Sequence, residues 1–251
     1  MSGYAATRSD RLPPNPAQRY ATLLALLALV LGSVALGLAG AVRDLSGGLL
    51  LSLMAIAVLL GWALAGAQTP GWLAGTLIVL LGFATSITRV GRLEGKLTLA
   101  LHTLAFLPWQ VLRWLLNGPP PDGALVLQSL GDVARGAATM LSRLGGWLLN
   151  TLVGEPAFDP IAAALLWGLA MWVTAAWAGW KVRRYQPLGG VAPAIGLLAS
   201  MLYYVGARPI SLVPVMFGAL LLIALAHHDA REQRWQAAET PFSRDVRREL
   251  A

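Results

Sequence analysis

The sequence predicts an all-α integral membrane protein, with about six transmembrane helices and an external amphipathic helical segment between the third and the fourth. Hydrophobic residues occupy 57% of the 251 positions, and charged residues only 12%. The mean hydropathy is +0.63, and the apolar residues gather in long runs of Leu, Ala, Val and Gly. A water-facing surface cannot hide such runs, whereas a bilayer stabilises them.

The chain begins with a tail, residues 1–19, that is polar, basic and rich in proline. The first apolar run, residues 20–42, ends at Arg43 and is long enough to cross a hydrocarbon layer of roughly 30 Å. A signal peptide is the alternative interpretation. The run exceeds the apolar core of about 7–15 residues that is typical of signal peptides, so we expect an uncleaved anchor.

Two further apolar runs, residues 47–67 and 72–88, complete a predicted three-span bundle over residues 20–88. The short turn between them contains Pro70 and Gly71, which break a helix and predict a helical hairpin. Lysine, arginine and glutamate side chains follow the third run. Each would cost a few kcal/mol at the bilayer centre, so they mark the end of the span.

The predicted external segment, residues 89–160, has a different pattern, because apolar residues from 97 to 151 alternate with polar and charged ones at helical spacing. We predict two interfacial helices on the external face, hinged at the proline-rich loop 118–123. Residues 97–117 approach the length of a span, but Pro108 interrupts them and Arg113 lies near their end. A seventh span there would reverse the side on which every later segment lies.

A second three-span bundle is predicted over residues 161–228, followed by a tail over residues 229–251. Pro160 stands at the start of its first run, where a missing amide costs nothing. Its three apolar runs are residues 161–180, 188–205 and 210–226.

The orientation follows from the lysines and arginines that flank the spans, because these residues resist translocation. Lys181, Arg183 and Arg184 form the strongest cluster. Placing this cluster in the cytoplasm puts 11 of the 19 lysines and arginines inside and 8 outside. We therefore expect a multi-pass protein of the inner (plasma) membrane, with both termini cytoplasmic.

Composition excludes several kinds of site. The chain has no cysteine, which excludes disulfides, thiolate metal sites and cysteine nucleophiles within it. The net charge of +7 does not indicate nucleic-acid binding, because the basic residues lie beside the apolar runs rather than on one amphipathic face. His227 and His228 point about 100° apart on a helix, and no third metal ligand is evident.

The remaining titratable residues form no catalytic pattern. Glu155 and Asp159 are four positions apart, but the prolines that follow each of them preclude a regular helix. His102 is the only histidine on the external side, and no motif joins it to Ser129 or Ser142. We predict no catalytic, cofactor-binding or metal-ligating residue, no cofactor, and no enzymatic activity in this chain.

The C-terminal tail carries the most specific motif, Q-R-W-Q-A-A-E-T-P-F-S-R-D-V-R-R-E-L, which starts at Gln233. It resembles the cytoplasmic stretch of bacterial membrane-anchored transglutaminase-like proteins, and the order of spans before it is similar to their N-terminal membrane domain. The resemblance implies a further span and an external domain with a Cys-His-Asp triad, encoded beyond or beside this chain. The matching residues are Trp235, Pro241, Phe242, Ser243, Asp245, Val246 and Arg247.

Three functions are compatible with these observations. The first is a non-catalytic membrane domain that anchors or assembles an external transglutaminase-like module. The alternatives are a small-molecule or lipid transporter, and an accessory or assembly subunit of a membrane complex. The expected spans contain no Asp, Glu, Lys or Arg, which disfavours an ion-coupled transporter. The expected partners are the lipid bilayer and such a module or another membrane protein; the oligomeric state is not predicted.

Overall fold

In the computed structural model, the described part of the chain contains eight α-helices, one short 3₁₀ helix and no strand. The N-terminal tail up to residue 15 and the motif at residues 241–247 lie outside the described residues. The residues that the structure describes are 16–116, 119–120, 122–155, 158–206 and 209–237.

Each apolar run forms the greater part of one α-helix. Five helices, α1, α2, α3, α6 and α7, are long and apolar enough to cross a membrane, which confirms a helical membrane protein. The sixth run lies in α8, whose apolar part, Leu212–His228, is shorter than the other five. The helices are α1 Pro16–Ala41, α2 Gly47–Gly66, α3 Gly71–Val90, α4 Glu94–Leu115, α5 Gly123–Val153, α6 Pro160–Arg183, α7 Pro187–Val205 and α8 Leu212–Ala237, with the 3₁₀ helix η1 at Pro209–Ser211.

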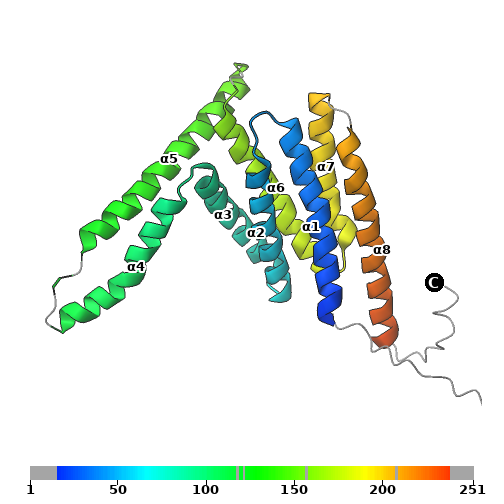
Figure 1. Cartoon of the computed structure of the whole chain (residues 1–251), viewed down its shortest axis with the longest axis horizontal. Coiled ribbons are helices and arrows are strands. Elements are labelled where there is room, and N and C mark those ends of the chain that lie inside the picture. The colour runs from blue at the N-terminus through cyan, green and yellow to red at the C-terminus, as the bar shows by residue number, and fades with distance from the viewer. Residues whose placement is uncertain (1–15, 117–118, 121, 156–157, 207–208, 238–251) are drawn as a thin grey trace, which may run out of the picture.

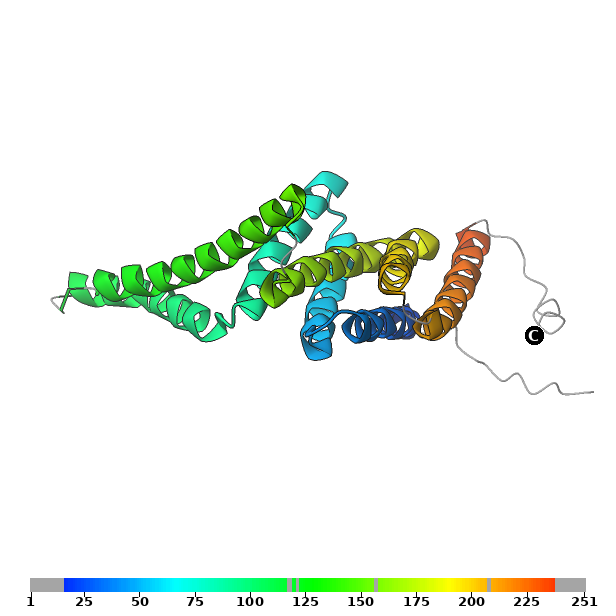
Figure 2. The same ribbon diagram turned by 90° about the horizontal axis from the view of Figure 1, so that it is seen from above.

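Six helices form a bundle, and the other two leave it. Figure 1 shows α1, α2, α3, α6, α7 and α8 side by side, whereas α4 and α5 slant away together from the end where α3 ends and α6 begins. The far tip of this pair lies level with the other end of the bundle. Figure 2 shows from above that the pair extends well to one side. We call α4 and α5 the arm.

The two ends of the bundle differ in charge. Lys181, Arg183 and Arg184 lie where α6 ends, and we call this the basic end. The aromatic rings of Tyr20, in the first described helix, and Trp62, in α2, contact Arg183 there. The last described turns of α8 reach the same end (Figure 1). The first and the last described helices therefore have their outer ends on the same side of the bundle.

Helices α2 and α6 make the closest backbone contact in the core. A Cβ atom on Gly61 would overlap the carbonyl oxygen of Ala176, and one on Gly179 would lie 2.6 Å from the carbonyl oxygen of Val58. Only glycine lets the two backbones approach so closely. Small residues have the same role at contacts between other membrane helices.

Trp172 joins α6 to α3 inside the bundle. Its side chain is 1% exposed, and its indole Nε1 donates a hydrogen bond of 2.9 Å to the carbonyl oxygen of Ile78. The ring fits because Gly82 has no side chain; a Cβ there would lie 2.5 Å from Trp172 Cδ1. The indole thus buries its apolar surface while its single donor is satisfied.

Helix α1 carries a row of small residues on the side that faces α7 and α8. A Cβ on Gly37 would lie 2.9 Å from Leu198 Cδ1. Ser33 and Ala41, four positions to either side, line an open groove of about 550 Å³ at the end away from the basic end, which Pro214 of α8 also lines. Of these three residues, Gly37 is the one at which a neighbouring helix approaches closely, whereas Ser33 and Ala41 border the groove.

Candidate functional site: the arm and the basic end

The arm begins and ends with specific capping residues. In α5, which runs for 31 residues, or about 46 Å, the Asp122 carboxylate accepts a hydrogen bond of 3.2 Å from the Leu125 amide. The helix ends at Gly154, whose φ of 87° is left-handed and favours glycine. Helix α4 carries Glu94 in its first turn, where a negative charge complements the helix dipole.

The two arm helices contact each other through a buried pair of hydroxyl groups. Thr103 Oγ1 and Ser129 Oγ lie 3.2 Å apart, and both side chains are buried. Ala100 and Val126, also buried, stand three positions before them on the two helices. Near the tip, the Asp122 amide donates a hydrogen bond of 3.2 Å to the Gln110 side-chain oxygen. These contacts set which turns of α4 and α5 lie opposite each other.

The root of the arm is attached to the bundle by packing and by an ion pair. Leu93, before α4, is 5% exposed, and a Cβ on Gly136 of α5 would lie 2.6 Å from its Cδ2. Arg143 Nε lies 3.2 Å from Asp159 Oδ2, and Asp159 caps α6 by accepting hydrogen bonds from the Ile161 and Ala162 amides. The arm is therefore connected to the start of α6.

The Asp159 carboxylate is stabilised in its charged form. Burial raises the pKa of this group, but the hydrogen bonds from Ala162 and Ile161 and the Arg143 charge outweigh burial and bring the pKa below its ordinary value of 3.8. Asp159 therefore remains ionised at neutral pH, and it acts as a helix cap and an ion-pair partner.

The outer face of the arm exposes many large apolar side chains. Leu127 is 74% exposed and Leu152 83%. An apolar surface of this extent needs cover from lipid or from a protein partner. The exposed members are Leu99, Leu101, Leu104, Phe106, Trp109, Leu112, Trp114, Leu115 and Leu116 in and after α4, and Leu125, Leu127, Leu130, Leu141, Leu148, Leu149, Leu152 and Val153 in α5.

At the basic end, Arg183 packs against two aromatic rings that also contact each other. Its guanidinium carbon is 5.8 Å from the Tyr20 ring centroid and 5.6 Å from that of Trp62. Arg183 also donates a hydrogen bond of 2.8 Å to the Trp62 carbonyl oxygen. A side chain on Gly66 would overlap the guanidinium. The glycine and the two rings together hold one cation against the ends of α1 and α2.

Lys181 and Arg184 pack on the two tryptophans of the last turns of α6. Lys181 Nζ lies 4.8 Å from the Trp177 ring centroid, and the Arg184 guanidinium carbon 4.2 Å from that of Trp180. The Trp177 indole donates a hydrogen bond of 2.9 Å to the Gly189 carbonyl oxygen at the start of α7. Tryptophans and cations at one level of a helical membrane protein are typical of the membrane–water interface.

His102, Ser129 and Ser142 were considered from the sequence as possible catalytic partners. In the structure each of them contacts other neighbours instead. The His102 ring packs on Phe106, with centroids 4.6 Å apart. Ser129 pairs with Thr103, and Ser142 donates a hydrogen bond to the Thr139 carbonyl oxygen. No hydrogen bond among the described residues joins His102 to either serine.

Asp159 pairs with Arg143 rather than with Glu155. His227 lines a cavity together with Arg231. In the described part of the chain, no group of three His, Asp or Glu side chains has a geometry suited to a metal ion.

Two contacts were missed by reasoning from the sequence: the Thr103–Ser129 pair and the Trp172–Ile78 hydrogen bond. The first had a weak signal, a lone small hydroxyl residue on each apolar stripe of the arm. The second had none, because its two residues are 94 positions apart.

No family model, no curated protein and no solved structure matches this chain. Together the arm and the basic end combine a membrane-anchored bundle with a long apolar surface outside it.

Proposed function

We propose that this chain is a non-catalytic membrane platform, which anchors or assembles an external transglutaminase-like module. The observation that carries the proposal is the arm. Its two helices are joined by a buried hydroxyl pair and attached to the bundle at the root, and their outer faces leave large apolar side chains exposed. An apolar surface that leaves the bundle suits a docking role better than a role in packing the bundle.

The interior of the bundle supports a platform over a transporter. In the part of the chain that the structure describes, the buried polar side chains are Ser86, Thr103 and Ser129, and none is charged. Ser86 alone belongs to a bundle helix. Ion-coupled carriers usually need ionisable or coordinating groups at membrane depth. The α2–α6 contact at Gly61 also closes the core rather than lining a path.

In this proposal α8 is the sixth span. Its apolar part has 17 residues, or about 26 Å of helix, close to the lower limit for crossing a bilayer. The basic end faces the cytoplasm, because its lysine and arginines resist translocation and its tryptophans suit the interface. Both termini are then cytoplasmic, and the protein lies in the inner membrane. The root of the arm lies at the external end of the bundle, and the arm slants from there to the level of the basic end (Figure 1), with its apolar side chains in lipid or against the partner.

Photo-crosslinking in intact cells tests this proposal. A photoreactive amino acid is placed at Leu149 or Leu152, which are 63% and 83% exposed and lie near the root of the arm. Matched positions on the bundle are Leu59 and Leu220, which are 58% and 61% exposed. We expect the arm positions, and not the bundle positions, to form an adduct with a protein that carries a Cys-His-Asp domain.

Adducts with lipid alone at both arm positions would contradict the docking role. Adducts with a membrane protein that lacks such a domain would instead favour an accessory subunit of another complex.

A further inference from the structure

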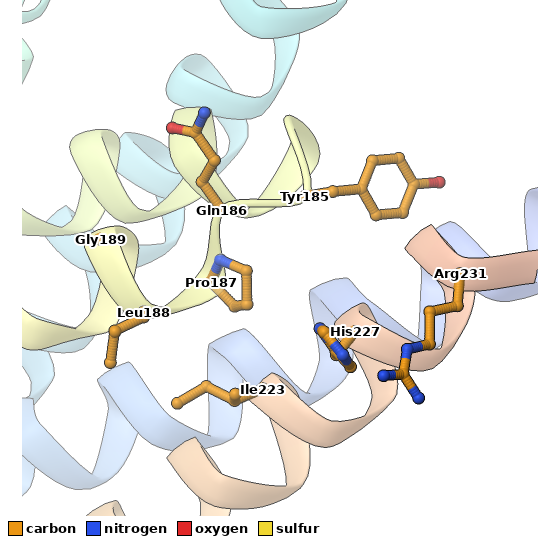
Figure 3. A pocket seen from close by; sticks show the side chains of 8 residues that line it. All are labelled: Tyr185, Gln186, Pro187, Leu188, Gly189, Ile223, His227 and Arg231. Atoms are coloured by element: carbon orange, nitrogen blue, oxygen red, sulfur yellow. The ribbon is translucent and has the colours of Figure 1, made fainter. Parts of the chain in front are cut away.

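A cavity of about 410 Å³ lies at the basic end, between the turn from α6 to α7 and the side of α8. Figure 3 shows its lining: Ile223 and Leu188 lie on one side, and His227 and Arg231 follow further along α8. The cavity is outside the arm, and the proposed docking role does not use it.

The cavity changes from apolar to basic along α8. His227 and Arg231 are four positions apart, so they lie on one face of the helix. Ile223 precedes His227 by four positions and extends the same face toward the middle of the bundle. From Ile223 to Arg231 the helix rises by about 12 Å. Leu188, 66% exposed, continues the apolar wall on α7.

The electrostatics of the cavity favour an anion. None of its eight lining residues is acidic. Lys181 belongs to the same end of the bundle, but its Nζ donates a hydrogen bond of 2.9 Å to the side-chain oxygen of Gln186, which points away from α8 (Figure 3). The first turn of α7, which starts at Pro187, directs its amide groups toward this region and adds partial positive charge. His227 and Arg231 supply the hydrogen-bond donors from the other wall.

The cavity also lies at the depth of a lipid headgroup. The carbonyl oxygen of Gly189, a lining residue, accepts the hydrogen bond of Trp177. Trp177 and Trp180 carry the cations of the basic end on their rings. Such tryptophans lie at headgroup level, with hydrocarbon on one side and water on the other. A ligand here therefore meets apolar wall toward the hydrocarbon and positive charge toward the water.

We propose that this cavity binds the headgroup of an anionic phospholipid, with the phosphate between His227 and Arg231 and the acyl chains leaving over Leu188 and Ile223. Basic residues near a membrane surface attract anionic lipids by about 1 kcal/mol each, which is a factor of roughly five in affinity. The adjoining apolar wall selects a lipid over a free phosphate ion, because it removes the first acyl carbons from water.

Native mass spectrometry of the full chain, released from a mild detergent, tests the site. The protein is titrated with dioleoyl phosphatidylglycerol, with zwitterionic dioleoyl phosphatidylcholine, and with inorganic phosphate alone. We expect phosphatidylglycerol to bind more tightly than phosphatidylcholine. Arg231→Gln should weaken phosphatidylglycerol binding roughly fivefold, whereas Arg231→Lys, which keeps the charge, should retain most of it.

Arg43→Gln is the matched control, because Arg43 is an exposed arginine at the other end of the bundle and its loss changes the net charge equally. If Arg231→Gln does not fold, His227→Leu removes a phosphate donor and should also weaken binding. Equal affinity for the two lipids, or an equal effect of Arg231→Gln and Arg43→Gln, would overturn the proposal. So would tight binding of inorganic phosphate without a preference for the lipid.

Discussion

Replacing Gly61 with alanine should destabilise the bundle, although alanine is the better helix former. The added Cβ would overlap the carbonyl oxygen of Ala176 on α6. This oxygen belongs to the backbone, so no side-chain rotation relieves the overlap. Helices α2 and α6 must instead move apart, and the buried side chains around their contact then lose part of their dispersion energy.

The size of the effect follows from two opposing contributions. Overpacking of a core costs about 1–3 kcal/mol, and a clash with backbone belongs at the upper end of that range. Alanine regains about 1 kcal/mol of helix propensity, which leaves a net loss of about 2 kcal/mol. Gly75, in α3, is the matched control, because a Cβ there would meet nothing within 4 Å. Gly75→Ala should keep the propensity gain of about 1 kcal/mol.

Thermal unfolding of the purified protein in detergent measures this difference. The two variants should differ by about 3 kcal/mol, which corresponds to roughly 6–12 °C in Tm for a chain of this length. Gly61→Ala should lie below the parent protein and Gly75→Ala at or above it. If Gly61→Ala unfolds at the same temperature as Gly75→Ala or higher, the close α2–α6 contact does not exist in the folded protein.

Four further predictions concern topology, the arm, acid stability and activity. An alkaline phosphatase fusion after Ala251 should be inactive, because both termini are expected in the cytoplasm. An active fusion there, together with an inactive fusion in the arm, would reverse the topology. A single cysteine introduced at Arg143, near the root of the arm, should react with an impermeant thiol reagent in intact cells. Its protection would contradict the external position of the root. Asp159→Ala should lower the free energy of unfolding by about 1 kcal/mol through loss of the α6 cap. Since the pKa of Asp159 is lowered in the folded protein, its contribution to stability is complete above pH 3.8 and is lost as the pH falls through the folded pKa. If parent and variant lose stability equally as the pH falls, Asp159 does not have this role. The purified chain should show no transglutaminase or peptidase turnover, because it has no cysteine to form a thiolate. Turnover by the parent chain that disappears in His102→Ala would refute the non-catalytic assignment.

The sequence by itself determined which segments become helices and where most of them end. Hydropathy and helix breakers act locally: an apolar run in lipid must satisfy its backbone groups within itself, and it therefore becomes a helix. The six apolar runs, the hairpin turn at Pro70 and the start of α6 at Pro160 follow from this rule. The division of the arm into two helices followed from the proline-rich loop between them.

Only the tertiary structure decided which helices contact one another and what their side chains do. Hydropathy does not indicate that Gly61 lies against Ala176. It also does not indicate that Arg183 packs against Tyr20 and against Trp62, which is 121 positions away from it. Such contacts depend on the matching shapes of surfaces far apart in the sequence, and many arrangements of six apolar helices bury similar areas. The direction of the arm likewise rests on the packing of Leu93 and the Arg143–Asp159 pair. Close packing and a few specific polar contacts select one arrangement, and both arise only when the chain is folded.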